Sequence, residues 1–156
     1  MIKASEVRVG IAVVEGCQTY RIVNELLRMG CREENLTIKI IPNDLHLALG
    51  VLFFAEYTEV DAVIALGCVI QGETRHFDFI CQGVTQGIMQ LQLQWNMPIA
   101  FGVLTVEDQQ QALDRCGGAL GNKGDEAAAT AIQMVKLQIE MDAASPDREP
   151  DRRNIN

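Results

Sequence analysis

The stretch DAVIALGCVIQGETRHFDFI, residues 61–80, decides the fold of this chain. Residues 61–70 are apolar without alternation, which predicts a central strand that is buried on both faces. A glycine turn at residues 72–74 then leads into a segment whose apolar residues recur at helical spacing, about every 3.6 residues. This stripe consists of Phe77, Ile80, Cys81, Val84, Ile88, Leu91 and Trp95. A buried strand, a turn and a long amphipathic helix together predict a βα unit.

The same alternation of strand and helix extends along the chain in both directions. Gly30 is predicted to end the first helix and Asp44 to cap the second. Residues 117–124 are predicted to form a glycine-rich break before the last helix. Strands that alternate with helices form parallel sheets with right-handed crossovers, so we predict an α/β fold with four parallel strands. The further strands are predicted at residues 7–14, 36–41 and 98–105, and the further helices at 20–29, 44–56, 107–116 and 125–141.

Length and charge narrow the class of protein. The 156 residues predict a single domain, residues 1–142, followed by a charged C-terminal tail, residues 143–156, that we expect to be mobile. The formal net charge of −8 argues against a nucleic-acid binder and against docking on anionic membranes. No run approaches the ~20 apolar residues of a membrane span, and the N-terminus lacks the pattern of a signal peptide.

The numbers and spacings of cysteine and histidine residues indicate the cellular compartment of the protein and whether it can bind a metal ion. The five cysteines stand at wide spacings without a CxxC motif, which predicts reduced thiols in a cytoplasmic protein and no zinc site. Only two histidines, His46 and His76, are present, and they leave little material for a metal centre. Apolar helical surfaces at residues 45–54 and 88–95 exceed what one subunit with a four-stranded sheet covers, which predicts a homo-oligomer.

The first candidate site lies at the glycine turn of the opening stretch. Parallel α/β sheets bind ligands beyond the carboxyl ends of their strands. The turn at residues 72–74 would offer backbone N–H groups to an anion such as phosphate, and His76 can exchange protons near neutral pH. The alternative interpretation makes Thr74 a helix cap and His76 a partly exposed surface histidine.

A second candidate site combines Arg115 with the glycine-rich loop at residues 117–124. Glycines allow a backbone to approach a ligand closely, although the loop lacks the GK[ST] of a P-loop. The alternative is a helix–helix corner that Asn122 caps. Phe101 could stack on a flat ring or pack in the core, and His46 could be a pocket group or a solvated helix residue.

Three blocks of this sequence together resemble lumazine synthase, the 6,7-dimethyl-8-ribityllumazine synthase family. The blocks stand in the order and spacing of that family and cover about half of the chain, residues 61–134. They are GCVIQGETRHFDFI with the long helix after it, PIAFGVLT, and ALDRCGGALGNKGDEAA. The resemblance implies a flavodoxin-like three-layer sandwich with helices on both faces of the sheet. It also implies assembly into pentamers, sometimes into an icosahedral shell of sixty subunits.

The resemblance implies a transferase that works without metal or redox cofactor in the penultimate step of riboflavin synthesis. In that step 5-amino-6-(D-ribitylamino)uracil condenses with 3,4-dihydroxy-2-butanone 4-phosphate, and the lumazine, phosphate and water are released. Riboflavin synthase is the protein partner that the resemblance implies.

The resemblance also assigns site residues, position by position. His76 corresponds to the proton-transfer histidine. Arg115 corresponds to a phosphate-binding arginine and Phe101 to an aromatic residue, both supplied by the neighbouring subunit. The other assigned substrate-binding residues are Glu73 and Thr74 of the phosphate-binding turn, Cys68, Val69 and Ile70 of the pyrimidine pocket, and Lys123 of the GNKG loop.

Two departures from the family lie in the half of the pocket that binds the uracil and its ribityl chain. The aromatic–Asn pair after the first strand corresponds here to the region of Cys17, without a stacking ring. The pattern Pro-Gly-Ala/Ser-Phe/Tyr-Glu after the second strand corresponds here to PNDLH, residues 42–46. The sequence-assigned site therefore includes Cys17, Asp44, Leu45 and His46, and His46 stands where the family has glutamate.

Three interpretations follow from these departures. The protein is a working synthase with altered affinity for the uracil, a non-catalytic homologue that keeps the shell-forming scaffold, or a homologue that uses a different amine. We favour the first interpretation, because a lost stacking contact is worth only ~0.5–1.5 kcal/mol beyond burial.

Overall fold

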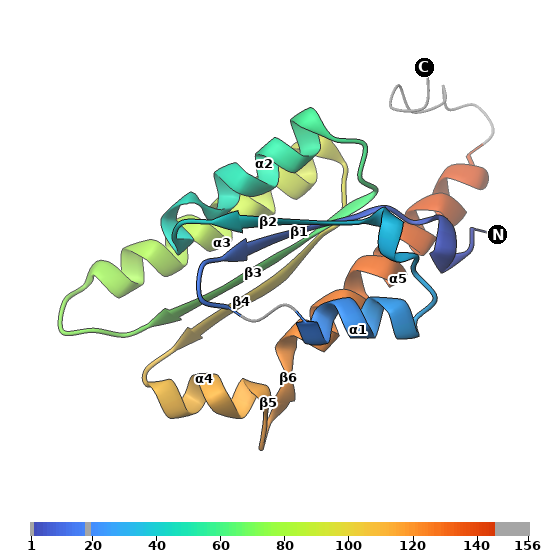
Figure 1. The fold of residues 1–156 in the computed structure, drawn as a ribbon. Coiled ribbons are helices and arrows are strands. Elements are labelled where there is room, and N and C mark those ends of the chain that lie inside the picture. The colour runs from blue at the N-terminus through green and yellow to red at the C-terminus, as the bar shows by residue number, and fades with distance from the viewer. Residues whose placement is uncertain (1, 18–19, 146–156) are drawn as a thin grey trace.

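The computed structural model describes residues 2–17 and 20–145 and has a sheet of four parallel strands at its centre (Figure 1). The strand order is β2-β1-β3-β4. The strands are β1 (Val9–Val14), β2 (Leu36–Ile41), β3 (Ala62–Ile70) and β4 (Ile99–Val106). The helices are α1 (Tyr20–Arg28), α2 (Leu47–Tyr57), α3 (His76–Trp95), α4 (Gln109–Arg115) and α5 (Lys123–Ala143).

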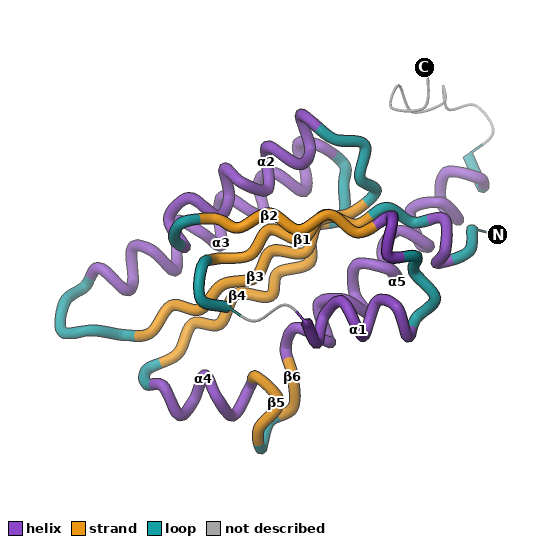
Figure 2. The backbone as a smooth tube through the Cα atoms, in the orientation of Figure 1, coloured by secondary structure: helices purple, strands orange, loops and turns teal. Residues whose placement is uncertain are grey.

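Helices cover both faces of the sheet and make three layers (Figures 1 and 2). Helices α1 and α5 pack on one face, where Ile11, Ile64 and Ile132 are fully buried. Helices α2 and α3 pack on the other face, around Leu47 and Ile88. Alternate residues of β1 and β3 serve the two cores, which explains why these strands are apolar throughout. The predicted α/β fold of the flavodoxin-like type is confirmed.

Most of the predicted elements are confirmed, with shifted ends. Gly30 does end the first helix, since it adopts a φ of +96° directly after the helical turn. The second helix begins later than predicted, because a 3-10 turn at Asp44–His46 precedes α2. The residue that caps this turn is Asn43 and not Asp44, since the Asn43 side chain accepts from the backbone N–H of His46.

The glycine-rich break contains a short antiparallel hairpin that was not predicted, β5 (Cys116–Gly118) and β6 (Gly121–Asn122). Gly117 and Gly121 have φ values of +102° and +82°, which only glycine adopts without strain. Asn122 caps α5 by accepting from the backbone N–H of Asp125, as the corner interpretation predicted. The predicted C-terminal tail lies outside the described residues from residue 146 onward, and its first residue still belongs to α5.

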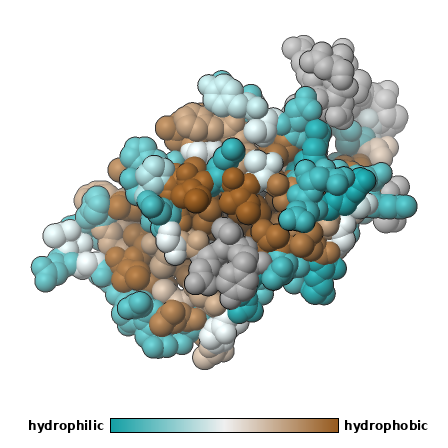
Figure 3. All heavy atoms as spheres, viewed as in Figure 1, coloured by the Kyte–Doolittle hydropathy of each residue, from teal (hydrophilic) through white to brown (hydrophobic). Residues whose placement is uncertain are grey.

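Several large apolar side chains remain exposed. Figure 3 shows apolar side chains gathered over β2, the edge strand nearest the viewer. Ile40 on β2 is 70% exposed, and Tyr57 on α2 is 74% exposed. Leu93 on the outer side of α3 is 82% exposed. These uncovered surfaces agree with the homo-oligomer that the sequence predicts. Among the described residues, no helix is long and apolar enough to cross a bilayer.

Candidate active site

The carboxyl ends of all four strands point the same way (Figure 1), so the segments that follow β1, β2 and β3 meet at one edge of the sheet. Val14 pairs with Ile41, and Val13 pairs with Leu66, which sets the three strand ends side by side. This register brings the sequence-assigned residues that follow β1 and β2 to the same edge as the last three residues of β3, although they lie far apart in the chain. The group comprises Cys17, Asp44, Leu45, His46, Cys68, Val69 and Ile70.

The Asp44 carboxyl packs against the backbone of β3 at Gly67. A Cβ atom added to Gly67 would overlap Asp44 Oδ1, so the glycine provides the space for the carboxyl. Asp44 Oδ1 is itself buried and has no hydrogen-bond partner among the described residues. Burial raises the pKa of this carboxyl, and the nearby backbone N–H of Cys68 opposes the rise.

Two thiols line the same strand ends. Burial raises the pKa of the Cys68 thiol to about 11, with smaller contributions from Cys17, Cys116 and Asp44, all of which lie nearby. Burial also raises the pKa of Cys17, and Asp44 adds to this rise. Both thiols are therefore protonated at neutral pH, so they can line a pocket but are poor nucleophiles.

The turn after β2 carries a fixed histidine. Asn43 Oδ1 accepts from the backbone N–H of His46 at 3.2 Å and lies 2.7 Å from His46 Nδ1. The His46 side chain remains exposed, as does Leu45 beside it. Asn43 stands where the family pattern has glycine, and no sequence signal showed that its side chain contacts the histidine ring.

The turn after β3 leaves its polar groups in solvent. Glu73, Thr74 and His76 are all exposed, and His76 is the first residue of α3. The Thr74 hydroxyl accepts from the backbone N–H of His76 at 3.3 Å. The N-cap position belongs to Arg75, which makes no side-chain cap bond, so the interpretation of Thr74 as the N-cap residue is corrected. In the first turn of this 20-residue helix, the backbone N–H of Asp78 donates to the carbonyl of Arg75 at 3.0 Å.

The remaining assigned residues line a different region. Phe101, Arg115 and Lys123 border a groove of about 460 Å³ between the outer edge of β4 and the start of α5. Phe101 pairs with Ala65 in the middle of β3, well before the strand end. Of the described residues that line this groove, none belongs to the turns at residues 43–46 or 72–76. One chain therefore does not gather all of its assigned residues in one place.

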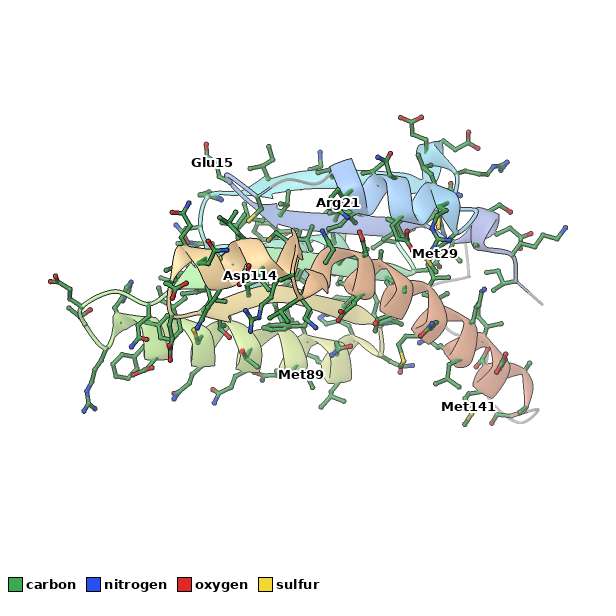
Figure 4. All side chains as sticks on the ribbon, turned by 90° about the horizontal axis from the view of Figure 1, so that it is seen from below. Glu15, Arg21, Met29, Met89, Asp114 and Met141 are labelled. Carbon is green, nitrogen blue, oxygen red and sulfur yellow. The ribbon has the colours of Figure 1, made fainter. Side chains whose placement is uncertain are left out.

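The cations of this groove are already engaged within the chain. Arg115 donates to the carbonyl of Gln111, and Lys123 forms an ion pair with Glu126 at 2.9 Å. Arg21 of α1, which sequence analysis did not assign, lies close to Asp125 of α5 and fills the space beside Gly117. Figure 4 shows Arg21 on the same face of the sheet as Asp114 of α4, with Met89 of α3 on the opposite side.

Comparison with known proteins extends the resemblance beyond the three blocks. Residues 12–138 match the family described as 6,7-dimethyl-8-ribityllumazine synthase. A protein of that name from Parabacteroides distasonis is 48% identical over 140 residues, which are 86% of this chain and 88% of the relative. One from Cytophaga hutchinsonii is 52% identical over 117 residues, 75% of this chain and 74% of the relative. One from Porphyromonas gingivalis is 45% identical over 139 residues, which are 85% of this chain and 86% of the relative. The chain belongs to the 6,7-dimethyl-8-ribityllumazine synthase family.

Proposed function

We propose that this protein is a working lumazine synthase, a transferase that condenses 5-amino-6-(D-ribitylamino)uracil with 3,4-dihydroxy-2-butanone 4-phosphate in riboflavin synthesis. Family membership over residues 12–138 supports this proposal. The observation that carries it is the placement of His76, which stands exposed on the first turn of α3, at the edge where β1, β2 and β3 end. The free cysteines at positions 17, 31, 68, 81 and 116 agree with a cytoplasmic location.

The chemistry needs little beyond alignment and proton transfer. The uracil amine attacks the ketone and forms an imine with loss of water. Removal of a proton then expels phosphate, and ring closure releases a second water. His76 moves protons in these steps. Glu73 and Thr74, with the N–H groups at the start of α3, hold the phosphate. Most of the rate enhancement comes from holding two reactants in one dry pocket.

The uracil half of the pocket is assigned to the group at the strand ends. Cys68, Val69 and Ile70 line the pyrimidine ring, together with Cys17. The turn that carries Asp44, Leu45 and His46 contacts the ribityl chain. This half differs from the family pattern, so we expect the affinity for the uracil to be altered.

The site is complete only when two subunits meet. Phe101, Arg115 and Lys123 line a groove away from the other assigned residues, so in the proposal they serve the site of a neighbouring subunit. Arg115 and Lys123 then bind the phosphate, and Phe101 faces the uracil ring. The assembly proposed is a pentamer, and a measurement of particle mass distinguishes it from an icosahedral shell and from a complex with riboflavin synthase.

The decisive experiment mixes both substrates with purified protein and follows the fluorescent lumazine above the uncatalysed rate. We expect turnover, a moderate loss of kcat in His76→Ala, and a larger rise in KM for the phosphate substrate in Arg115→Ala. Arg32→Ala is the matched control, because Arg32 is exposed and pairs only with Glu34 among the contacts described. Absence of turnover in an assembled wild-type particle would favour the scaffold interpretation, and unchanged KM in Arg115→Ala would refute the role of that arginine.

A further inference from the structure

The side chain of Asn43 determines how the His46 ring presents its two nitrogens. Asn43 Oδ1 accepts from the backbone N–H of His46 at 3.2 Å and lies 2.7 Å from the ring Nδ1. A backbone N–H can only donate, so the Asn43 atom that faces it is the amide oxygen and not the amide nitrogen. The hydrogen-bond network therefore fixes the orientation of the amide.

The same oxygen fixes the tautomer of the histidine. An amide oxygen can only accept, so Nδ1 at 2.7 Å must carry a hydrogen. In the neutral ring, Nε2 then has a free lone pair and is a hydrogen-bond acceptor. The ring is exposed at the edge of the sheet, so this lone pair is available to a ligand.

We propose that Asn43 and His46 form a hydrogen-bond acceptor for a hydroxyl group on the polyol chain of the uracil substrate. His46 Nε2 accepts the hydroxyl hydrogen, and Asn43 is a positioning residue that holds the ring. This inference rests on the proposed function. In this chain His46 stands where the family has a glutamate, so one acceptor replaces another.

The neighbouring carboxyl is less exposed than the His46 ring. Asp44 directs its Oδ1 against Gly67 of β3, where the atom is buried. Leu45 has no polar atom in its side chain. His46 is thus the polar side chain of the 3-10 turn that is classed as exposed, whereas Asp44 is half-buried.

A spectroscopic test needs no substrate. Histidine labelled with ¹⁵N gives signals from only two residues, His46 and His76, and the spectrum of His46→Gln assigns them. We expect His46 to be protonated at Nδ1 in the wild type and in Asn43→Asp, whose carboxylate accepts the same bonds. In Asn43→Ala we expect the tautomer to shift toward Nε2–H. Protonation at Nε2 in the wild type, or no change in Asn43→Ala, would overturn the role of Asn43.

A kinetic test addresses the ligand. His46→Leu removes the acceptor, and we expect KM for the ribityl uracil to rise about tenfold to a hundredfold, while KM for the phosphate substrate stays within about twofold. Asn43→Ala should raise the same KM by less, and His46→Glu should restore it. An analogue whose polyol is replaced by a plain alkyl chain should bind the wild type and His46→Leu equally.

The two proposals fail in different ways. If the wild type shows no turnover, the proposed function is refuted. Calorimetric titration with the ribityl uracil then tests the inference about Asn43 and His46. That inference is refuted if the wild type does not bind the ribityl uracil, or if the wild type and His46→Leu bind it equally well. A wild type with turnover and an unchanged KM in His46→Leu refutes the inference alone.

Discussion

Gly67→Ala tests whether the Asp44 carboxyl is held in a space that only glycine leaves open. The added Cβ would overlap Asp44 Oδ1 and would lie 3.3 Å from Val14 Cγ2 and 3.4 Å from Leu47 Cδ2. The contact with Leu47 is an ordinary van der Waals separation and the contact with Val14 is slightly tight, so the carboxyl is the group that must move most. The backbone at Gly67 is not in the left-handed region, so any cost is steric rather than conformational.

The magnitude follows from the behaviour of overpacked cores. Inserting a methyl group into a packed site costs about 1–3 kcal/mol. For a protein of this size, each kcal/mol lowers Tm by about 2–4 °C. Asp44→Ala removes the overlapping atoms and introduces a residue that the family accepts at this position. In that background we expect Gly67→Ala to lose most of its penalty, which gives a coupling energy of about 1 kcal/mol or more.

The assay compares thermal unfolding of the wild type, both single variants and the double variant at one protein concentration, because assembly makes Tm depend on concentration. Gly83→Ala is the matched control, since its added Cβ meets nothing within 4 Å. It lies in α3, where alanine favours the helix by roughly 0.5–1 kcal/mol over glycine. An equal penalty for Gly67→Ala with and without the Asp44 side chain would show that the carboxyl does not occupy the predicted space.

Three further predictions use the same set of contacts. Asp44→Asn should raise Tm at neutral pH. Because the pKa of Asp44 is raised in the folded state, ionisation of this carboxyl destabilises the fold as pH rises from the unfolded-state pKa through the folded-state pKa. The Tm of the wild type, measured relative to that of the variant, should therefore fall across this pH window. The Cys68 thiol has a pKa of about 11, so roughly one part in a thousand is ionised at pH 8. Iodoacetamide should therefore label Cys68 at least about tenfold more slowly than the exposed Cys116. Equal labelling of the two cysteines in peptide mass spectra would contradict the burial of Cys68. Asn122→Ala removes the cap of α5 and should cost about 1 kcal/mol, seen as a fall in Tm that Asn122→Ser avoids.

The sequence was sufficient to predict the layers of the fold because burial repeats with a period. The unbroken apolar run that became β3 and the 3.6-residue stripe on α3 both reflect which side faces the core. Element ends were less predictable, since neighbouring polar residues compete for the same N–H groups. Asn43 rather than Asp44 caps the turn before α2, and either residue type is a good cap. The β5–β6 hairpin has no apolar pattern at all.

The types of residue at the site were predictable, but their partners were not. The contact between Asp44 and Gly67 depends on the packing of two segments that are 23 positions apart and carries no local signal. The division of the assigned residues between the strand ends and the β4 groove follows from strand order, which sequence patterns do not specify. The link between Asn43 and the His46 ring is local in sequence, yet it depends on a 3-10 turn that was predicted as helix.

The departures from the family pattern at residues 43–46 are mutually consistent in three dimensions. The amide of Asn43 makes two contacts with His46, and the carboxyl of Asp44 has a space that Gly67 leaves open. Relaxed selection on a disused pocket leaves substitutions that are independent of one another, whereas Asn43 orients the group that replaces the family's glutamate. The uncompensated cost is the buried oxygen of Asp44, which would be a liability in a protein selected only as a scaffold. Linked substitutions of this kind are what the proposed function predicts for a pocket rebuilt around a ligand with hydrogen-bond donors.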